Sequence, residues 1–141
     1  MLEAKAKDTI KVVFMKGDPV MIEKPSRTST LIKDGGWFGG RSHAPEIPLN
    51  MTVLDEELFG KISNAMTETG FFGATAYYLN HDVNAEYGQK SLDGGVLSTP
   101  TLFIEAKYDA VCTTAVSKLE EPMRQYCANL TEHSIEAGHW V

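Results

Sequence analysis

The chain is 141 residues long, about the length of one domain, and 43% hydrophobic and 23% charged residues are typical of a globular protein. Its net charge of −6 argues against a nucleic-acid or anionic-membrane partner, since either would favour a basic surface. The longest segment without a charged side chain, residues 69–81, is too short to cross a bilayer. Two cysteines, and an N-terminus without the apolar core of a signal peptide, predict a reducing, cytoplasmic environment.

The first third of the chain is predicted to be irregular but packed. A short apolar run at residues 9–14 leads into a turn sequence. Residues 17–48 are rich in proline, and residues 35–40 are rich in glycine, so neither a regular helix nor a central strand is expected there. Trp37 and Phe38 weigh against disorder, because disordered segments are poor in aromatic residues.

A helix is predicted next, with Thr52 as its cap and Gly70 at its end. Acidic residues in its first turns suit the positive end of the helix dipole. Its predicted apolar stripe consists of Leu54, Leu58, Ile62, Ala65 and Met66. A second helix is expected to start within residues 76–80 and to run toward Tyr87, and residues 94–95 mark a boundary.

Beyond this boundary the pattern changes to strand, helix, strand. Residues 101–106 are almost continuously apolar, which is typical of a parallel strand buried on both faces. Residues 114–127 form a candidate helix that Pro122 must break or restart, and residues 130–137 form a second candidate strand. We therefore expect an α/β fold with a right-handed βαβ unit. Because two parallel strands alone do not make a stable sheet, we expect a piece of something larger or a second chain that completes the sheet.

Each predicted strand is followed by a residue that can carry out proton chemistry. Asp109 follows the first strand and His139 follows the second. In open α/β sheets ligands gather at the carboxyl ends of the strands, where an acid can fix the tautomer of a neighbouring imidazole and stabilise the imidazolium. Considered singly, Asp109 suits a turn and His139 suits a structural position. The residues alone therefore leave a catalytic pair and two structural residues equally open.

Several segments share their order and spacing with one known family: residues 11–17, 35–40, 70–73 and 73–80 upstream, and residues 108–112, 121–124, 129–132 and 138–140 downstream. They resemble the helical cap and the C-terminal region of epoxide hydrolases of the α/β-hydrolase fold, particularly fungal ones. The resemblance covers essentially the whole chain. It implies a partial α/β-hydrolase fold with a helical cap at residues 1–93 and the C-terminal part of the core at residues 94–141. The N-terminal half of the sheet and the final helix are then missing.

The resemblance also implies an activity and its residues. In this family an Asp nucleophile opens an epoxide to an ester, which a water activated by a His–Asp pair hydrolyses to a vicinal diol. By position His139 matches the general base, Asp109 its orienting acid, and Tyr78 the cap phenol that donates to the epoxide oxygen. Taken alone, Tyr78 is better explained as a half-buried cap tyrosine. The residues expected at the substrate site are Trp37, Phe38, Tyr77 and Trp140.

The expected partners are a small-molecule epoxide and, in the full-length protein, a second copy bound through the cap; neither a cofactor nor a metal is implied. The nucleophile has no counterpart, because the sequence contains no Gly-x-Asp-x-Gly or His-Gly-x-Asp-Trp motif. We therefore expect a truncated chain that is inactive alone. Two alternatives stay open: a haloalkane or haloacid dehalogenase of the same fold, which a cap tyrosine disfavours, and a non-catalytic remnant or binding module.

Overall fold

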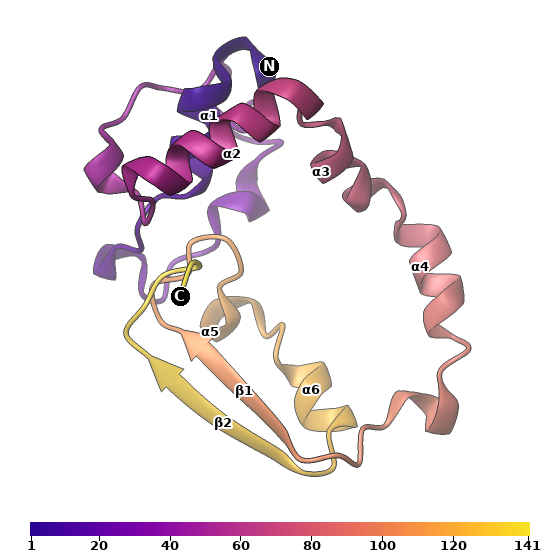
Figure 1. Cartoon of the computed structure of the whole chain (residues 1–141). Coiled ribbons are helices and arrows are strands. Elements are labelled where there is room, and N and C mark those ends of the chain that lie inside the picture. Colours follow the sequence, from indigo (N-terminus) through magenta and orange to yellow (C-terminus); the bar gives the residue numbers. More distant parts are fainter.

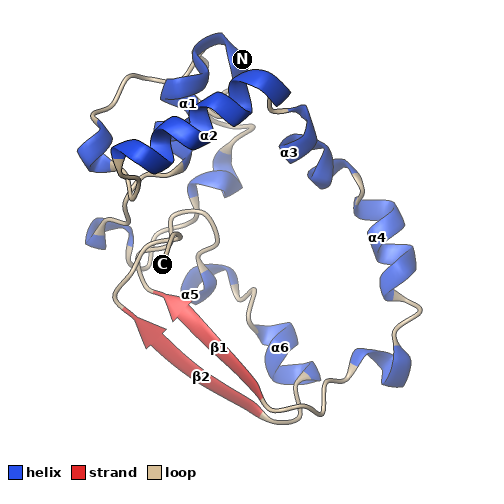
Figure 2. Cartoon of the chain, in the orientation of Figure 1, coloured by secondary structure: helices blue, strands red, loops and turns tan.

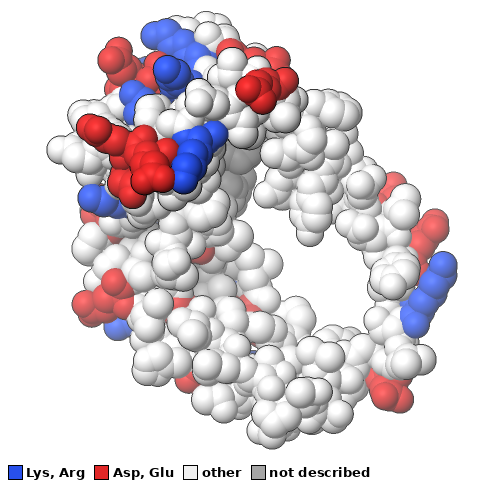
Figure 3. All heavy atoms as spheres, in the orientation of Figure 1, with Lys and Arg blue, Asp and Glu red and all other residues white. Residues whose placement is uncertain are grey.

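The computed structural model describes residues 1–141, with every side chain except that of Ala115. Helices and a small parallel sheet together give a mixed α/β structure. Figure 1 shows three parts around an opening, which the space-filling view in Figure 3 also shows. They are a helical body (residues 1–71), an arm (residues 72–100) and a sheet unit (residues 101–141).

The helices and strands follow in chain order as α1 (Ala6–Val13), α2 (Glu56–Thr69), α3 (Phe72–Ala76), α4 (His81–Gly88), β1 (Thr101–Ala106), α5 (Thr114–Ser117), α6 (Glu121–Tyr126) and β2 (Leu130–Ile135). Short 3-10 helices lie at Glu3–Lys5, Pro19–Met21, Arg27–Thr30, Leu49–Met51, Tyr77–Leu79 and Leu92–Gly95. No helix in the described part of the chain has both the length and the apolar character that a bilayer span requires.

The core of the molecule lies in the helical body, where α1 packs against α2 (Figure 2). Ile10, Leu54 and Phe71 are buried there and contact one another. Partly buried apolar side chains surround them: Leu2, Ala6, Phe14, Leu49, Phe59, Ile62 and Met66. Since full burial of one large apolar side chain contributes about 1.5–3 kcal/mol, this cluster is the main source of stability in the body.

Helix α2 begins later than the sequence predicted. Asp55 is its N-cap, and the Asp55 carboxylate accepts a hydrogen bond of 2.7 Å from the Leu58 N–H. The prediction of Thr52 as the cap is wrong, because Thr52 is buried, forms an antiparallel bridge with Met15, and donates its hydroxyl to the Leu49 carbonyl. The predicted end at Gly70 is confirmed, and its positive φ of 69° suits glycine.

The apolar stripe of α2 also differs in part from the prediction. Ile62 and Met66 pack against the core as expected, but Leu58 and Ala65 are exposed. Phe59 takes the inward position instead. At the 3.6-residue period of a helix, residues 59, 62 and 66 share one face, and this face packs against the core.

The proline-rich stretch between α1 and α2 is irregular, as predicted. Phe38 and Ala44 are buried, so part of the stretch is packed, whereas Trp37 is exposed. Gly35 and Gly36 adopt φ angles of 77° and 101°, which favour glycine over any other residue.

The arm consists of short pieces rather than the predicted helix running to Tyr87. The chain leaves helical geometry at Asn80, where ψ is 21°, so that α3, one 3-10 turn and α4 follow one another. Nearly every arm side chain is exposed, and only Ala76 and Gly95 are partly covered. Figure 1 shows the arm bridging the helical body and the sheet unit. Only its last residues join the sheet unit, where Leu97 forms a parallel bridge with Cys127.

The sheet unit confirms the predicted strand–helix–strand order. β1 and β2 pair in parallel, in register from Thr101 opposite Leu130 to Ala106 opposite Ile135. Between them α5 ends at Ser117, and α6 carries Pro122 in its first turn, which confirms the predicted restart.

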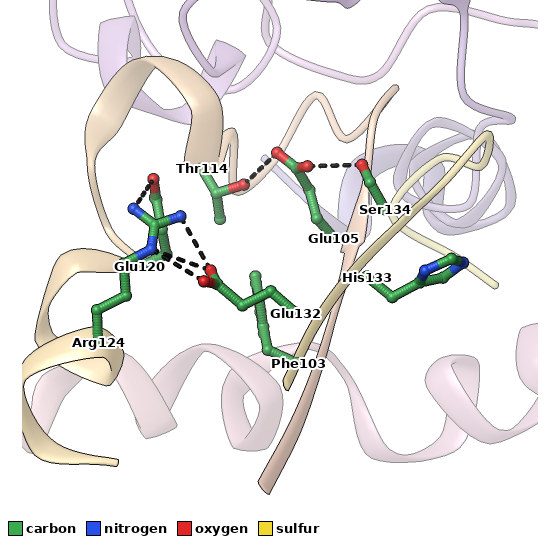
Figure 4. A pocket seen from close by; sticks show the side chains of 8 residues that line it. All are labelled: Phe103, Glu105, Thr114, Glu120, Arg124, Glu132, His133 and Ser134. Carbon is green, nitrogen blue, oxygen red and sulfur yellow. Dashed lines mark hydrogen bonds and ion pairs between the residues drawn. The ribbon is translucent and has the colours of Figure 1, made fainter. Parts of the chain in front are cut away.

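The prediction that β1 is buried on both faces is wrong. Helices α5 and α6 lie over the face that carries Phe103 and Glu105 (Figures 2 and 4). Leu102 and Ile104 point to the opposite face and are exposed. No described helix covers that face, so only one face of β1 is covered.

Candidate active site

The parallel pairing of the strands brings the two predicted proton-transfer residues to one edge of the sheet. Beyond the strands, the Lys107 N–H donates to the Ile135 carbonyl at 3.0 Å, and the Tyr108 N–H donates to the Ala137 carbonyl at 2.8 Å. These bonds keep the two chain segments side by side as far as Asp109 and His139. This edge, at the carboxyl ends of the strands, is where open α/β sheets bind ligands.

Asp109 and His139 form a direct hydrogen bond of 2.9 Å between Oδ2 and Nδ1. An ionised carboxylate can only accept, so Nδ1 carries the proton of the neutral imidazole and Nε2 keeps its lone pair. The Asp109 side chain is 15% exposed, whereas that of His139 is 32% exposed. The carboxylate is thus the more enclosed partner, and the imidazole is the one that solvent reaches.

Backbone groups fix the other oxygen of the carboxylate. Asp109 Oδ1 accepts from the Val111 N–H at 2.7 Å and from the Cys112 N–H at 2.9 Å. Burial raises the pKa of the Asp109 carboxyl, but the hydrogen bonds from Cys112, His139 and Val111 outweigh it and lower that pKa below its ordinary value. Asp109 is therefore a charged acceptor in the neutral pH range.

The turn after Asp109 is held from outside by the irregular stretch of the helical body. The Arg27 N–H donates to the Ala110 carbonyl at 2.9 Å, and Thr28 Oγ1 donates to the Val111 carbonyl at 2.8 Å. The Ser26 hydroxyl also donates to the Val111 carbonyl. These residues of the 3-10 segment Arg27–Thr30 and its cap therefore bind the same turn whose N–H groups bind the carboxylate.

Sequence reasoning missed these residues. Ser26 and Thr28 are ordinary turn residues in the sequence, and more than 80 positions separate them from Val111. No local pattern records a pairing over that separation. The only available signal was the run of small hydroxyl side chains within a loop that was expected to be packed.

Tyr78 is not brought together with the pair. It lies on the arm in the 3-10 turn Tyr77–Leu79, and its side chain is 64% exposed. Its ring contacts that of Tyr77 edge-on, with a centroid distance of 5.5 Å. Tyr77, which was expected at the substrate site, is exposed too. Figure 1 shows the α3–α4 segment across the opening from the C-terminus.

The residues expected at the substrate site lie in different environments. Trp140 adjoins the pair, with its ring edge-on to the His139 imidazole at a centroid distance of 4.8 Å. Phe38 is buried and Trp37 is exposed, both in the glycine-rich loop of the helical body. Of the four expected residues, Trp140 is therefore the one that the structure places against His139.

One described pocket lies on the helix-covered face of the sheet rather than at the pair (Figure 4). Arg124 spans it, with ion pairs to Glu132 at 2.9 Å and to Glu120 at 3.2 Å. Glu105 accepts hydrogen bonds from Ser134 and Thr114, which lower the pKa of its carboxyl. With a volume of about 230 Å³, the pocket is smaller than a typical small-molecule site. Most of its charged groups bond to one another, as in a structural network, although Glu120 Oε2 is buried without a hydrogen-bond partner.

Among the described residues, no cluster of three or more His, Cys, Asp or Glu side chains has the arrangement of a metal site. The nearest thiol to the pair is Cys112, whose N–H binds Asp109. Burial, followed by the charge of Asp109, raises the pKa of the Cys112 thiol, so it is not an activated nucleophile. The chemistry that this site can perform is proton transfer through His139.

Comparison with known proteins found no matching family model, no matching curated protein and no matching solved structure. The family resemblance thus depends on the residues quoted above. The independent structural observation is that Asp109 and His139 meet at the carboxyl ends of two parallel strands. A functional proposal has to start from that pair.

Proposed function

We propose that this chain carries the acid–base half of an epoxide hydrolase-like site, with His139 as general base and Asp109 as its orienting acid. The single observation that supports the proposal is the 2.9 Å bond from His139 Nδ1 to a carboxylate whose other oxygen is held by two backbone N–H groups. A carboxylate fixed in this way holds one imidazole tautomer and leaves Nε2 free to accept a proton.

The proposed step is the hydrolysis of an ester between substrate and an aspartyl nucleophile. A water molecule attacks the ester carbonyl while His139 Nε2 takes one of its protons. The resulting imidazolium is stabilised by the Asp109 carboxylate, which keeps its charge because its pKa is lowered. The ester bond then breaks, the diol oxygen receives the proton from His139, and the carboxylic acid that forms loses its remaining proton to solvent, which regenerates the nucleophile carboxylate. The sequence of this chain contains no motif that would carry the aspartyl nucleophile.

The proposal extends to the fold. β1 and β2 act as the last parallel strands of an α/β-hydrolase sheet in residues 94–141, and residues 1–93 act as the cap. The exposed Leu102 and Ile104 support this, because an apolar strand of this kind normally has a covered layer on both sides. The proposed substrate is a small epoxide, the cap is the proposed surface for a homodimer, and the proposed location is the cytoplasm.

The proposed roles of the cap residues require the arm to move. Tyr78 can donate to an epoxide oxygen only when the arm closes over His139, since the α3–α4 segment that carries it lies across the opening from the C-terminus. Trp37 and Phe38 are proposed to form an apolar wall of the same cap. Trp140 already lies beside the base, which supports its role in binding substrate near the reacting carbon.

The test uses the full-length protein that supplies the aspartyl nucleophile, with styrene oxide as substrate and diol formation as the signal. His139→Ala should form the ester but stall before hydrolysis, so intact-mass spectrometry should detect protein that has gained the mass of one substrate. His133→Ala is the matched control, because His133 is an exposed residue of β2 away from the pair. Unchanged turnover in His139→Ala, or no trapped ester, would contradict the proposal.

A chloroalkane assayed in parallel separates the nearest alternative. Release of halide without diol formation from styrene oxide would favour a dehalogenase of the same fold. Neither product, from a protein that is folded by circular dichroism, would favour a non-catalytic binding module.

A further inference from the structure

We propose that Trp140 is a positioning residue that ties His139 to the C-terminal end of α1, so that the helical body sets the geometry of the Asp109–His139 pair. This inference deepens the proposed function and rests on it for its catalytic meaning. The contacts of Trp140 can be tested separately from the proposed activity.

Trp140 connects the histidine to α1 through both of its chemical groups. Its indole Nε1–H donates to the Val13 carbonyl at 2.8 Å. Val13 is the last residue of α1, and the last four carbonyls of a helix have no partner within the helix. The indole ring stacks on Phe14 with a centroid distance of 4.4 Å, and its other neighbour is the His139 imidazole. One side chain therefore bridges the helix end and the base.

The attachment point on α1 is itself fixed. Phe14 packs against the buried cluster of Ile10, Leu54 and Phe71. The Val53 N–H donates to the Phe14 carbonyl at 3.0 Å. Trp140 is thus anchored to the buried cluster of the helical body, and displacement of that cluster displaces the residue next to His139.

The backbones of Gly17 and Gly138 are in close contact, two residues before Trp140 in the case of Gly138. A Cβ atom built on Gly17 would lie 2.4 Å from the Gly138 Cα, and one built on Gly138 would lie 2.5 Å from the Gly17 Cα. Both neighbours are backbone atoms, which cannot swing away as a flexible side chain can. Because Gly138 directly precedes His139, any side chain at either position pushes the backbone of the base.

The helical body also holds the other member of the pair, since Ser26, Arg27 and Thr28 bind the turn that follows Asp109. The acid and the base are therefore each attached to the same N-terminal body by separate contacts. This arrangement makes the length of the Asp109–His139 bond dependent on how the body sits against the sheet unit.

The experiment is proton NMR of the complete chain, with the downfield Nδ1 proton of His139 assigned by its loss in His139→Ala. Trp140→Phe keeps a ring that can stack on Phe14 but removes the indole donor. We expect the Nδ1 proton to exchange with water about tenfold faster, which corresponds to the loss of one hydrogen bond of ordinary strength. Gly17→Ala should broaden or abolish the signal. Gly60→Ala in α2 is its control, since nothing lies near a Cβ built there.

An unchanged Nδ1 proton in folded Trp140→Phe, with the strand amide signals retained, would overturn the inference. So would the absence of such a signal from the unaltered protein, because the pair would then not be formed. If the variants shift the signal while the full-length protein converts no epoxide, the positioning role stands and the proposed function fails. If epoxide turnover depends on His139 while Trp140→Phe changes neither the signal nor the pH profile of turnover, only the positioning role fails.

Discussion

The helical body and the arm contain similar apolar sequence but use it in opposite ways. Phe71, at the end of the body, is 8% exposed and belongs to the buried cluster. Its neighbour Phe72, the first residue of the arm, is 74% exposed. In the body, α1 and α2 give each other an apolar face, whereas α3 and α4 in the arm face no second layer. An apolar residue contributes to stability only where the fold supplies the surface that covers it.

The arm and the outer face of β1 share this lack of cover. Tyr77, Leu79 and Tyr87 of the arm are exposed, as are Leu102 and Ile104 of the strand. Figure 3 shows that on the viewed face the charged side chains gather mainly over the helical body. On that face the exposed arm carries fewer charged side chains than the helical body, which is consistent with a surface that packs against further protein.

The largest expected effect tests the boundary between these two regions. Phe71→Ala should lower the free energy of unfolding by about 3–5 kcal/mol, since it leaves a cavity beside Ile10 and Leu54. Phe72→Ala should change it by less than about 0.5 kcal/mol, because its ring is already in water. Urea denaturation followed by circular dichroism measures both. A comparable loss in the two variants would show that the arm is packed in solution, and the contrast drawn above would fail.

A smaller effect is expected at the pair, where the sheet unit meets the body. Asp109→Asn removes a charged acceptor of three hydrogen bonds, from His139, Val111 and Cys112. At neutral pH this should cost about 1–2 kcal/mol, since partial exposure weakens the charged bonds. The measurement is the unfolding free energy of both proteins across the acidic pH range.

The pH dependence of this loss has a definite sign. Because the pKa of Asp109 is lowered in the folded protein, its contribution is fully present above the ordinary value of 3.8 and is lost as the pH falls through the lower folded value. The gap between wild type and variant should thus be constant above about pH 5 and close in stronger acid. A gap that widens on acidification would contradict the assignment of Asp109 as a charged acceptor.

The smallest effect compares one helix start in each region. Asp55 caps α2 through a bond to the Leu58 N–H, so Asp55→Ala should cost about 1 kcal/mol. Asn80 precedes α4 without a side-chain cap bond, so Asn80→Ala should leave the stability unchanged. Thermal melts of the two variants measure the difference. Equal shifts in melting temperature would mean that the Asp55 cap bond contributes no stability of its own.

Some features of the fold could be predicted because short-range chemistry fixes them. The apolar run of β1 after Pro100, the restart at Pro122 and the end of α2 at Gly70 all depend on residues within one or two turns of each other. The position of Asp109 and His139 at neighbouring strand ends follows from the same local elements plus parallel pairing. The cap at Asp55 was missed because Thr52 offers an equally good local signal, which its burial and its bridge to Met15 exclude.

By itself, then, the sequence determined where the two strands lie, where α2 ends and which acid and base stand at the edge of the sheet. Only the tertiary structure decided that Ser26 and Thr28 hold the acid, that Val13 holds Trp140 beside the base, and that the arm with Tyr78 stays uncovered. The physical reason is separation along the chain. Local propensity acts over a few residues, whereas the contact between Val13 and Trp140 spans 127 positions and exists only because separately formed parts pack together.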